Sequence, residues 1–277
     1  MRARTLAGVT AVVVVSLAAI AAGQRPSPSA GQQYRPPVDY PDPTGTFSVL
    51  GFDPKTGELG GAVQSRVFSV GNGVLWAEAE VGIVTTQAIV DVSYGPKGLA
   101  LLRQGMAPKA IIARILADDP DPGYNGRPWP KAGRQFAVMT PKGELAAHTG
   151  PEASTWAGDR QGTFVTAQGN ILAGPAVVEN MVEAFEKTEN KPDGTPNHLS
   201  FRLLAALEAG QAFGGDTRGQ QSAAMLIVRK GCGVWLNNDT VLRLQVDNDP
   251  QPIAKLRENV EWWWQNQRRQ RPGCPGQ

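Results

Sequence analysis

The hydrophobic positions of the chain change their period several times, and each change predicts a different element. Residues 46–50 and 60–65 alternate apolar and polar side chains, as half-buried strands do. Residues 96–103 and 108–117 instead carry apolar side chains at helical spacing, and Gly105 between them is a helix stop. A pair of helices is therefore expected after the first strands.

The same alternation of strand blocks and helix pairs continues to the end of the chain. Further strands are expected at 74–77, 81–87, 135–139, 144–148, 163–167, 222–228, 234–236 and 241–246. Further helices are expected at 175–187, at 199–209 and from 250 to about 269. Pro175 suits the first helical position and Gly210 suits a helix end. This order predicts sheets covered by layers of helices.

The segment before residue 46 has no such periodicity. Residues 1–23 contain two arginines, an apolar run and a small-residue end, which is typical of a secretory signal peptide. Residues 24–45, rich in Pro, Ser and Gln, are expected to form an extended linker. We therefore expect a secreted or periplasmic protein that is free of the membrane after signal cleavage; an uncleaved membrane anchor is the alternative. A single domain at 46–270 with a C-terminal helix, and a flexible tail at 271–277, complete the organisation.

Composition narrows the classes of partner. The chain has 277 residues, 41% of them hydrophobic, and a formal net charge of +2, so it can form a core but lacks the basic excess typical of nucleic-acid binding. We expect a small-molecule substrate and no nucleic acid, and leave a homo-oligomer open. Cys232 and Cys274 are the only cysteines, and either a disulfide or two unpaired thiols is compatible with export. His148 and His198 lie in no metal-binding pattern, so neither a metal nor an organic cofactor is expected.

Thr46 is the candidate nucleophile. If the chain were cut after Gly45, Thr46 would become N-terminal and combine a hydroxyl nucleophile with an amine whose reference pKa is about 7.7 to 8.0. Removal of the signal peptide alone would leave Gln24 at the terminus, so a second cut is required, for instance by attack of Thr46 on the carbonyl of Gly45. The alternative is that Thr46 is an ordinary β-branched residue beginning an edge strand.

Three polar side chains are candidates to assist this nucleophile. Ser65 is assigned to proton movement near the amine, and Gln87 and Asn170 to stabilisation of an oxyanion. The alternative for Gln87 and Asn170 is ordinary hydrogen bonding at strand ends, and the alternative for Ser65 is that a small residue in a packed strand needs no function.

Three arginines are candidates for binding a substrate. Arg66, Arg134 and Arg218, together with Asp216, could hold a substrate carboxylate, because a planar guanidinium matches the geometry of that group. An internal ion pair, for instance with Asp216, is the alternative.

Many short segments between residue 46 and about residue 256 form one ordered set. They are Thr46-Phe47-Ser48, Asp53-Pro54-x-Thr56-Gly57-Glu58-Leu59-Gly60, Ala62-Val63-x-Ser65-Arg66, Thr86-Gln87, Ser93-Tyr94-Gly95-Pro96, Arg134-Gln135, His148-Thr149-Gly150, Gln168-Gly169-Asn170 and Gly214-Gly215-Asp216-x-Arg218-Gly219-x-Gln221-Ser222. This set resembles the bacterial domain of unknown function 1028, which is placed among the N-terminal nucleophile (Ntn) hydrolases. The resemblance implies an α+β fold, a four-layer αββα sandwich of the Ntn-hydrolase type, and hydrolysis of amide-like C–N bonds with Thr46 as nucleophile.

Two functions are therefore carried forward. The first is an exported Ntn-type hydrolase that cleaves an amide-like C–N bond of a small molecule. The alternative is a non-catalytic secreted binding domain on the same scaffold, which recognises an acidic small molecule or a cell-wall fragment. The Gly45-Thr46 junction is also similar to that of proteasome-type threonine hydrolases, but no lysine occurs between Lys55 and Lys97 and Gln64 stands where an aspartate is expected. This difference from the proteasome-type pattern favours the non-catalytic binding domain.

Overall fold

The computed structural model describes residues 45–233, 235–266 and 274. All of them belong to one compact unit, Pro41–Gln277. The expected signal peptide and all of the expected linker except Gly45 lie outside the described residues, so export stays a prediction. In the described part of the chain, no helix is both long enough and apolar enough to cross a membrane.

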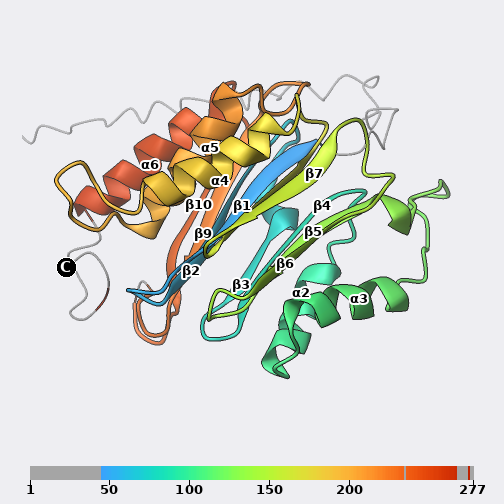
Figure 1. Ribbon diagram of the computed structural model, residues 1–277, viewed down its shortest axis with the longest axis horizontal. Coiled ribbons are helices and arrows are strands. Elements are labelled where there is room, and N and C mark those ends of the chain that lie inside the picture. The colour runs from blue at the N-terminus through green and yellow to red at the C-terminus, as the bar shows by residue number, and fades with distance from the viewer. Residues whose placement is uncertain (1–44, 234, 267–273, 275–277) are drawn as a thin grey trace, which may run out of the picture. The chain divides into compact units, whose positions relative to one another are not determined.

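Two antiparallel sheets lie at the centre of this unit (Figure 1). The larger has the strand order β10-β9-β2-β1-β8-β7 and consists of β1 (Thr46–Asp53), β2 (Glu58–Ser65), β7 (Ala157–Gly162), β8 (Val165–Asn170), β9 (Ser222–Val228) and β10 (Thr240–Val246). The smaller has the order β3-β4-β5-β6 and consists of β3 (Leu75–Glu78), β4 (Gly82–Ala88), β5 (Arg134–Met139) and β6 (Leu145–Thr149). Strand β1 lies between β2 and β8, so the idea that Thr46 begins an edge strand is wrong.

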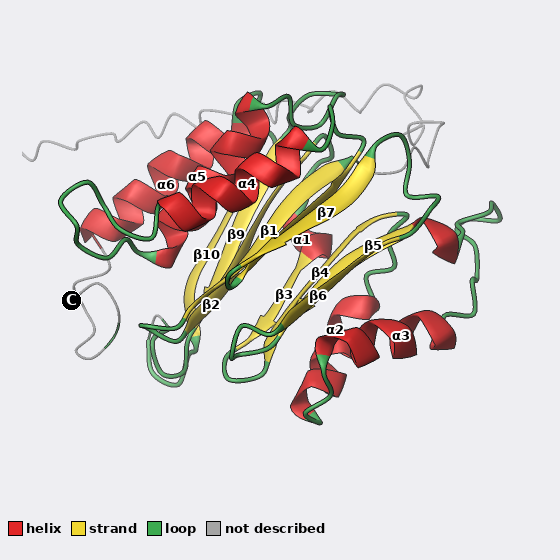
Figure 2. Ribbon diagram, viewed as in Figure 1, coloured by secondary structure: helices red, strands yellow, loops and turns green. Residues whose placement is uncertain are grey.

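Helices cover the outer face of each sheet (Figure 2). The described residues form six α-helices and one short 3-10 helix, which are α1 (Gly71–Val74), α2 (Tyr94–Arg103), α3 (Pro108–Asp118), η1 (Lys131–Gly133), α4 (Ala176–Lys187), α5 (Leu199–Ala212) and α6 (Pro252–Asn266). Helices α4, α5 and α6 pack on the larger sheet, and α2 and α3 pack on the smaller one. The expectation of a mixed fold with sheets and covering helices is confirmed.

Two local predictions fail, and one strand of the structure was not predicted. Trp235 and Leu236, expected in a strand, lie in the β9–β10 loop and are 88% and 92% exposed. Gly210 does not end α5; a Cβ on it would lie 2.8 Å from Met181 Cγ, so this glycine permits close packing of α5 on α4. Strand β7 was not predicted because its middle residues are exposed and polar, which leaves no apolar alternation to detect.

The side chains of β1 divide between two cores. Phe47 and Val49 belong to the cluster under α4, α5 and α6, whereas Leu50 belongs to the cluster between the two sheets. Because successive side chains of a strand point to opposite faces, Thr46 and Ser48 lie on the same face as Leu50. The fold therefore directs the Thr46 side chain into the space between the sheets, at one end of the larger sheet.

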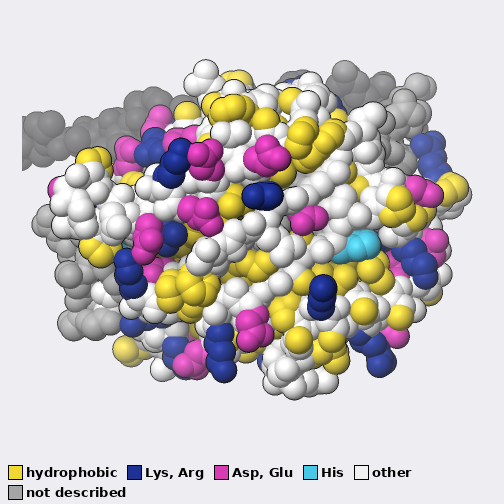
Figure 3. Space-filling view, in the orientation of Figure 1, with side chains coloured by type: hydrophobic (Ala, Val, Ile, Leu, Met, Phe, Trp, Pro, Cys, Tyr) yellow, Lys and Arg dark blue, Asp and Glu magenta, His cyan; other side chains and the backbone are white. Residues whose placement is uncertain are grey.

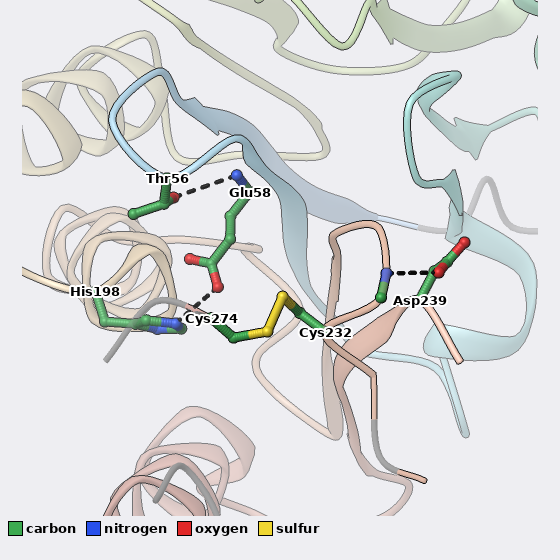
Figure 4. The surroundings of a disulfide bond; sticks show 7 residues. Thr56, Glu58, His198, Cys232, Asp239 and Cys274 are labelled. Atoms are coloured by element: carbon green, nitrogen blue, oxygen red, sulfur yellow. Dashed lines mark hydrogen bonds and ion pairs between the residues drawn. A yellow bond between two sulfur atoms is a disulfide. The ribbon is translucent and has the colours of Figure 1, made fainter. Parts of the chain in front are cut away.

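A disulfide joins the β9–β10 loop to the C-terminal segment. Cys232 and Cys274 are bonded, 42 residues apart in sequence, which answers the question that the sequence left open. Figure 4 shows the bond close to Glu58 and His198, whose Oε1 and Nε2 atoms are 3.1 Å apart. Cys274 is described, whereas the other residues of the expected flexible tail at 271–277 lie outside the described residues.

Candidate active site

Strand pairing brings three of the candidate catalytic residues to one end of the larger sheet. In the register of β1, Thr46 lies opposite Ser65 of β2 and opposite Asn170 of β8. The Thr46 hydroxyl donates to Ser65 Oγ at 3.1 Å, and Thr46 is only 1% exposed. Ser65 and Asn170 lie far from Thr46 in sequence, so the pairing of the strands creates the cluster.

The carbonyl of Gly45 receives two hydrogen bonds at this point. Ser65 Oγ donates to Gly45 O at 2.5 Å, and Arg218 Nη2 donates to the same oxygen at 2.8 Å. The Thr46 hydroxyl, the Ser65 hydroxyl and the Gly45 carbonyl therefore form a continuous chain of hydrogen bonds. Two donors on one carbonyl polarise it and would stabilise the negative oxygen of a tetrahedral adduct.

Asp216 holds the arginine in place. Its Oδ1 and Oδ2 atoms accept hydrogen bonds from Arg218 Nε at 3.1 Å and Nη2 at 2.8 Å, a bidentate pair. Asp216 also accepts from the backbone N–H of Arg66 at 3.3 Å, while the Arg66 side chain is exposed. A Cβ on Gly45 would lie 2.7 Å from Arg218 Nη2 and 2.8 Å from Asp216 Oδ2, so a larger residue at position 45 would displace this pair.

Gln87 reaches the site from the smaller sheet. Its Nε2 lies 3.5 Å from Thr46 O, 3.3 Å from Gln168 O and 2.8 Å from Gln135 Oε1. Its Oε1 accepts from Ser48 Oγ at 2.5 Å, which sets the orientation of the amide. The network fixes Gln87 beside the backbone of Thr46 and ties the two sheets together.

Ser48, Gln135 and Gln168 were not predicted to belong to the site. All three are almost fully buried, and Gln135 Nε2 donates to Gly169 O at 2.8 Å. The sequence signal that could have revealed them is the placement of uncharged polar side chains on strands that are otherwise apolar. Buried amides need hydrogen-bond partners, and here Gln87 donates to Gln135 Oε1 while Gln168 donates to Ser48 Oγ.

Arg134 does not join this cluster. Its neighbour Gln135 points between the sheets, so Arg134 points to the opposite face of β5. There its Nε lies 3.1 Å from Asp119 Oδ2, and its Nη1 donates to the carbonyls of Ile89 and Trp129 at 2.9 and 3.0 Å. The structure thus gives Arg134 the internal ion pair that the sequence had kept as an alternative, with Asp119 as the partner.

Tyr94 completes the Arg134 pair. Its hydroxyl donates to Asp119 Oδ2 at 2.5 Å. Burial raises the pKa of Tyr94 well above its ordinary value, and the hydrogen bond to Asp119 adds to this effect. Burial also acts to raise the pKa of Asp119, but the hydrogen bonds from Tyr94 and from the backbone, together with Arg134, outweigh it and hold that pKa below its usual range.

A cavity of about 160 Å³ opens beside Thr46. Its lining residues are Thr46, Val67, Phe68, Ser69, Val70, Gly73, Val74, Thr86, Gln87, Val90 and Val92. Phe68 and Val92 are 69% and 48% exposed, so the cavity communicates with the surface. A small molecule in this cavity would lie against the candidate nucleophile.

Charge is distributed evenly over the face of the molecule that Figure 3 shows. On the face shown in Figure 3, basic and acidic side chains are interspersed and do not form a large patch of one sign. Among the described residues there is also no group of three or more His, Cys, Asp or Glu side chains arranged to hold a metal ion.

Comparison with known proteins identifies the family. The sequence profile of a family of unknown function, DUF1028, matches residues 46–256. The crystal structure of a DUF1028 protein from Silicibacter pomeroyi is similar with a TM-score of 0.67 and 30% identity, over 81% of this chain and 88% of that one. No curated protein is a significant match. The chain therefore belongs to the DUF1028 family.

Proposed function

We propose that this protein is an exported Ntn-type hydrolase that cleaves an amide-like C–N bond of a small molecule with Thr46 as nucleophile. The observation that carries the proposal is the Gly45 carbonyl, which accepts from Ser65 and Arg218 next to the Thr46 hydroxyl. The succession of helices, sheet, sheet and helices supports the Ntn type of sandwich.

The first chemical step is cleavage of the Gly45–Thr46 bond. Thr46 Oγ attacks the carbonyl carbon of Gly45 and passes its proton to Ser65, whose own proton moves to the carbonyl oxygen of the adduct. That proton then passes to the amide nitrogen, which leaves as the Thr46 amine as the carbonyl re-forms. The resulting ester between Gly45 and Thr46 is then hydrolysed by water. The products are a carboxylate on Gly45 and a free amine on Thr46.

The mature site then acts on substrate in the same way. The free amine of Thr46 accepts the hydroxyl proton as Oγ attacks the substrate carbonyl, and returns it to the departing nitrogen. Ser65 and Arg218, released from the carbonyl of Gly45, become available to stabilise the substrate oxyanion. Water hydrolyses the acyl-Thr46 ester and regenerates the hydroxyl.

The alternative, a binding domain for acidic molecules, has less support. Arg134 is paired with Asp119, Arg218 is paired with Asp216, and the residues that line the cavity beside Thr46 carry no formal charge. Arg66 is exposed and is the remaining candidate for an acidic ligand.

Intact-mass measurement of the exported protein tests the proposal. A mature chain that begins at Thr46 is expected, and Thr46→Ala should leave the junction with Gly45 uncut. Thr46→Ser is the matched variant, because it keeps a hydroxyl and an amine and should still be processed. A stable mature chain that begins near Gln24 would contradict the proposal.

A further inference from the structure

The cavity beside Thr46 has an apolar wall. Five valines, Val67, Val70, Val74, Val90 and Val92, make up nearly half of its lining. They come from the segment after β2, from α1 and from the segment after β4, so they surround the cavity from several sides. A charged group in such a wall would lose its hydration without gaining a partner.

Most polar side chains of the lining already have partners within the protein. Thr86 Oγ1 donates to Gly73 O at 2.5 Å and accepts from Trp76 Nε1 at 3.2 Å. Ser69 Oγ donates to Asp247 Oδ1 at 2.5 Å. Thr46 and Gln87 are also hydrogen-bonded, to Ser65 and to Ser48 and Gln135, so the lining presents mainly apolar side chains to an occupant.

The volume of the cavity limits the size of the group that can be buried in it. The cavity measures about 160 Å³. An apolar protein cavity of about 150 Å³ accommodates one benzene molecule. A branched aliphatic or single-ring group of about six non-hydrogen atoms therefore fits, with a carbonyl group directed at Thr46.

We infer that the substrate carries an uncharged, branched aliphatic or aromatic group next to its scissile carbonyl, and that this cavity binds that group and rejects a carboxylate. The inference rests on the proposed function for the bond that is cleaved. The preference for an uncharged group rests separately on the lining. This preference for an uncharged group disagrees with the acidic small molecule that the arginines in the sequence suggested.

Binding of two isosteric amides to the purified protein tests this inference. The neutral probe is 4-methylpentanamide, and the charged probe is succinamate, in which a carboxylate replaces the isopropyl group. Ligand-observed NMR titration should give an affinity for 4-methylpentanamide at least about tenfold higher than for succinamate. Phe68→Ala should weaken binding of the neutral probe by about threefold or more, because the ring lines the cavity. Phe213→Ala is the matched control, since Phe213 is 51% exposed and does not line the cavity.

Equal or tighter binding of succinamate, no binding of 4-methylpentanamide, or unchanged binding to Phe68→Ala would each overturn the inference. Failure of the proposed function has a different signature: no 4-methylpentanoate appears in the titrated samples and the mature chain begins upstream of Thr46. Because ligand-observed NMR reports binding whether or not the amide is hydrolysed, the two failures are distinguishable in the same experiment.

Discussion

The guanidinium of Arg218 donates to the carbonyl oxygen of Gly45 across 173 positions of sequence. Asp216 fixes that guanidinium through two hydrogen bonds, so the cation is held at the carbonyl before any reaction begins. A donor arranged in advance stabilises the developing oxyanion without reorganising during the reaction.

Arg218→Gln should therefore slow cleavage of the Gly45–Thr46 bond. Loss of one oxyanion donor costs about 10²- to 10³-fold in rate, and this is the expected effect. The cleaved fraction is followed by intact mass as a function of time after synthesis. Arg66→Gln is the control, because the Arg66 contact with Asp216 comes from its backbone N–H. Equal rates in the two variants would contradict a role for the Arg218 side chain.

Ser65→Ala should slow the same cleavage, because the hydroxyl connects Thr46 Oγ1 with the Gly45 carbonyl. It both accepts the nucleophile's proton and donates to the oxyanion, so a loss of about 10²-fold or more is expected. Ser48→Ala removes an equally buried hydroxyl that contacts Gln87 instead of Gly45. If both variants were processed at the rate of the natural chain, Ser65 would be a structural residue.

Asp119→Asn should destabilise the fold by about 3–5 kcal/mol, because it leaves the buried Arg134 guanidinium without a counter-charge. The side chains of Arg134 and Asp119 are 2% and 0% exposed. The free energy of unfolding from urea titration measures the loss. The adjacent Asp118 supplies the control: its pair with Arg114 is more than half exposed, so Asp118→Asn should cost no more than about 1 kcal/mol. Similar losses in the two variants would refute the assignment of Arg134 to the core.

Most elements of this fold were predictable because periodicity is a local property. Strand β9 was expected at 222–228, the range it occupies, since it is buried on both faces and reads as an apolar run. The position of β1 was not predictable, because its pairing with β8 depends on residues more than a hundred positions away. Strand β7 gave no signal, because its exposed polar residues resemble a loop.

The candidate site, like the fold, was predictable from the sequence only in part. Gly45 and Thr46 could be chosen from the sequence, because the proposed chemistry needs a particular residue at a particular junction. The contacts of Arg218 with Gly45 and of Arg134 with Asp119 could not be predicted from the sequence, since all arginines have the same chemistry and the fold decides which partner each one meets. Alternation along β5 places Arg134 and Gln135 on opposite faces of the strand, but the sequence does not say which of the two faces lies against the larger sheet.

Cys274→Ser should lower the free energy of unfolding by about 2–4 kcal/mol, because a cross-link over 42 residues restricts the unfolded chain. Urea titration under oxidising conditions measures the change. Reducing agent should lower the stability of the natural chain by a similar amount and leave the variant unaffected. Adding Cys232→Ser to Cys274→Ser should cause little further loss, and a large additional loss would show that Cys232 stabilises the fold by packing.

The stability of the protein should rise with pH in the range just below the ordinary pKa of histidine. Burial of His148 in β6, beside the ring of Phe136, lowers its pKa below the usual 6.5, and the nearby Asp159 only partly opposes this effect. Between the folded pKa and about 6.5 the unfolded chain binds more protons than the folded chain, so stability is lost as the pH falls through this window. His148→Gln should flatten the dependence, as measured by urea titration at several pH values between about 5 and 7.5. Asp159→Asn removes the opposing charge and should lower the pKa of His148 further, which NMR can follow because the chain has only two histidines. An unchanged pH profile in His148→Gln would mean that another group governs the acid response.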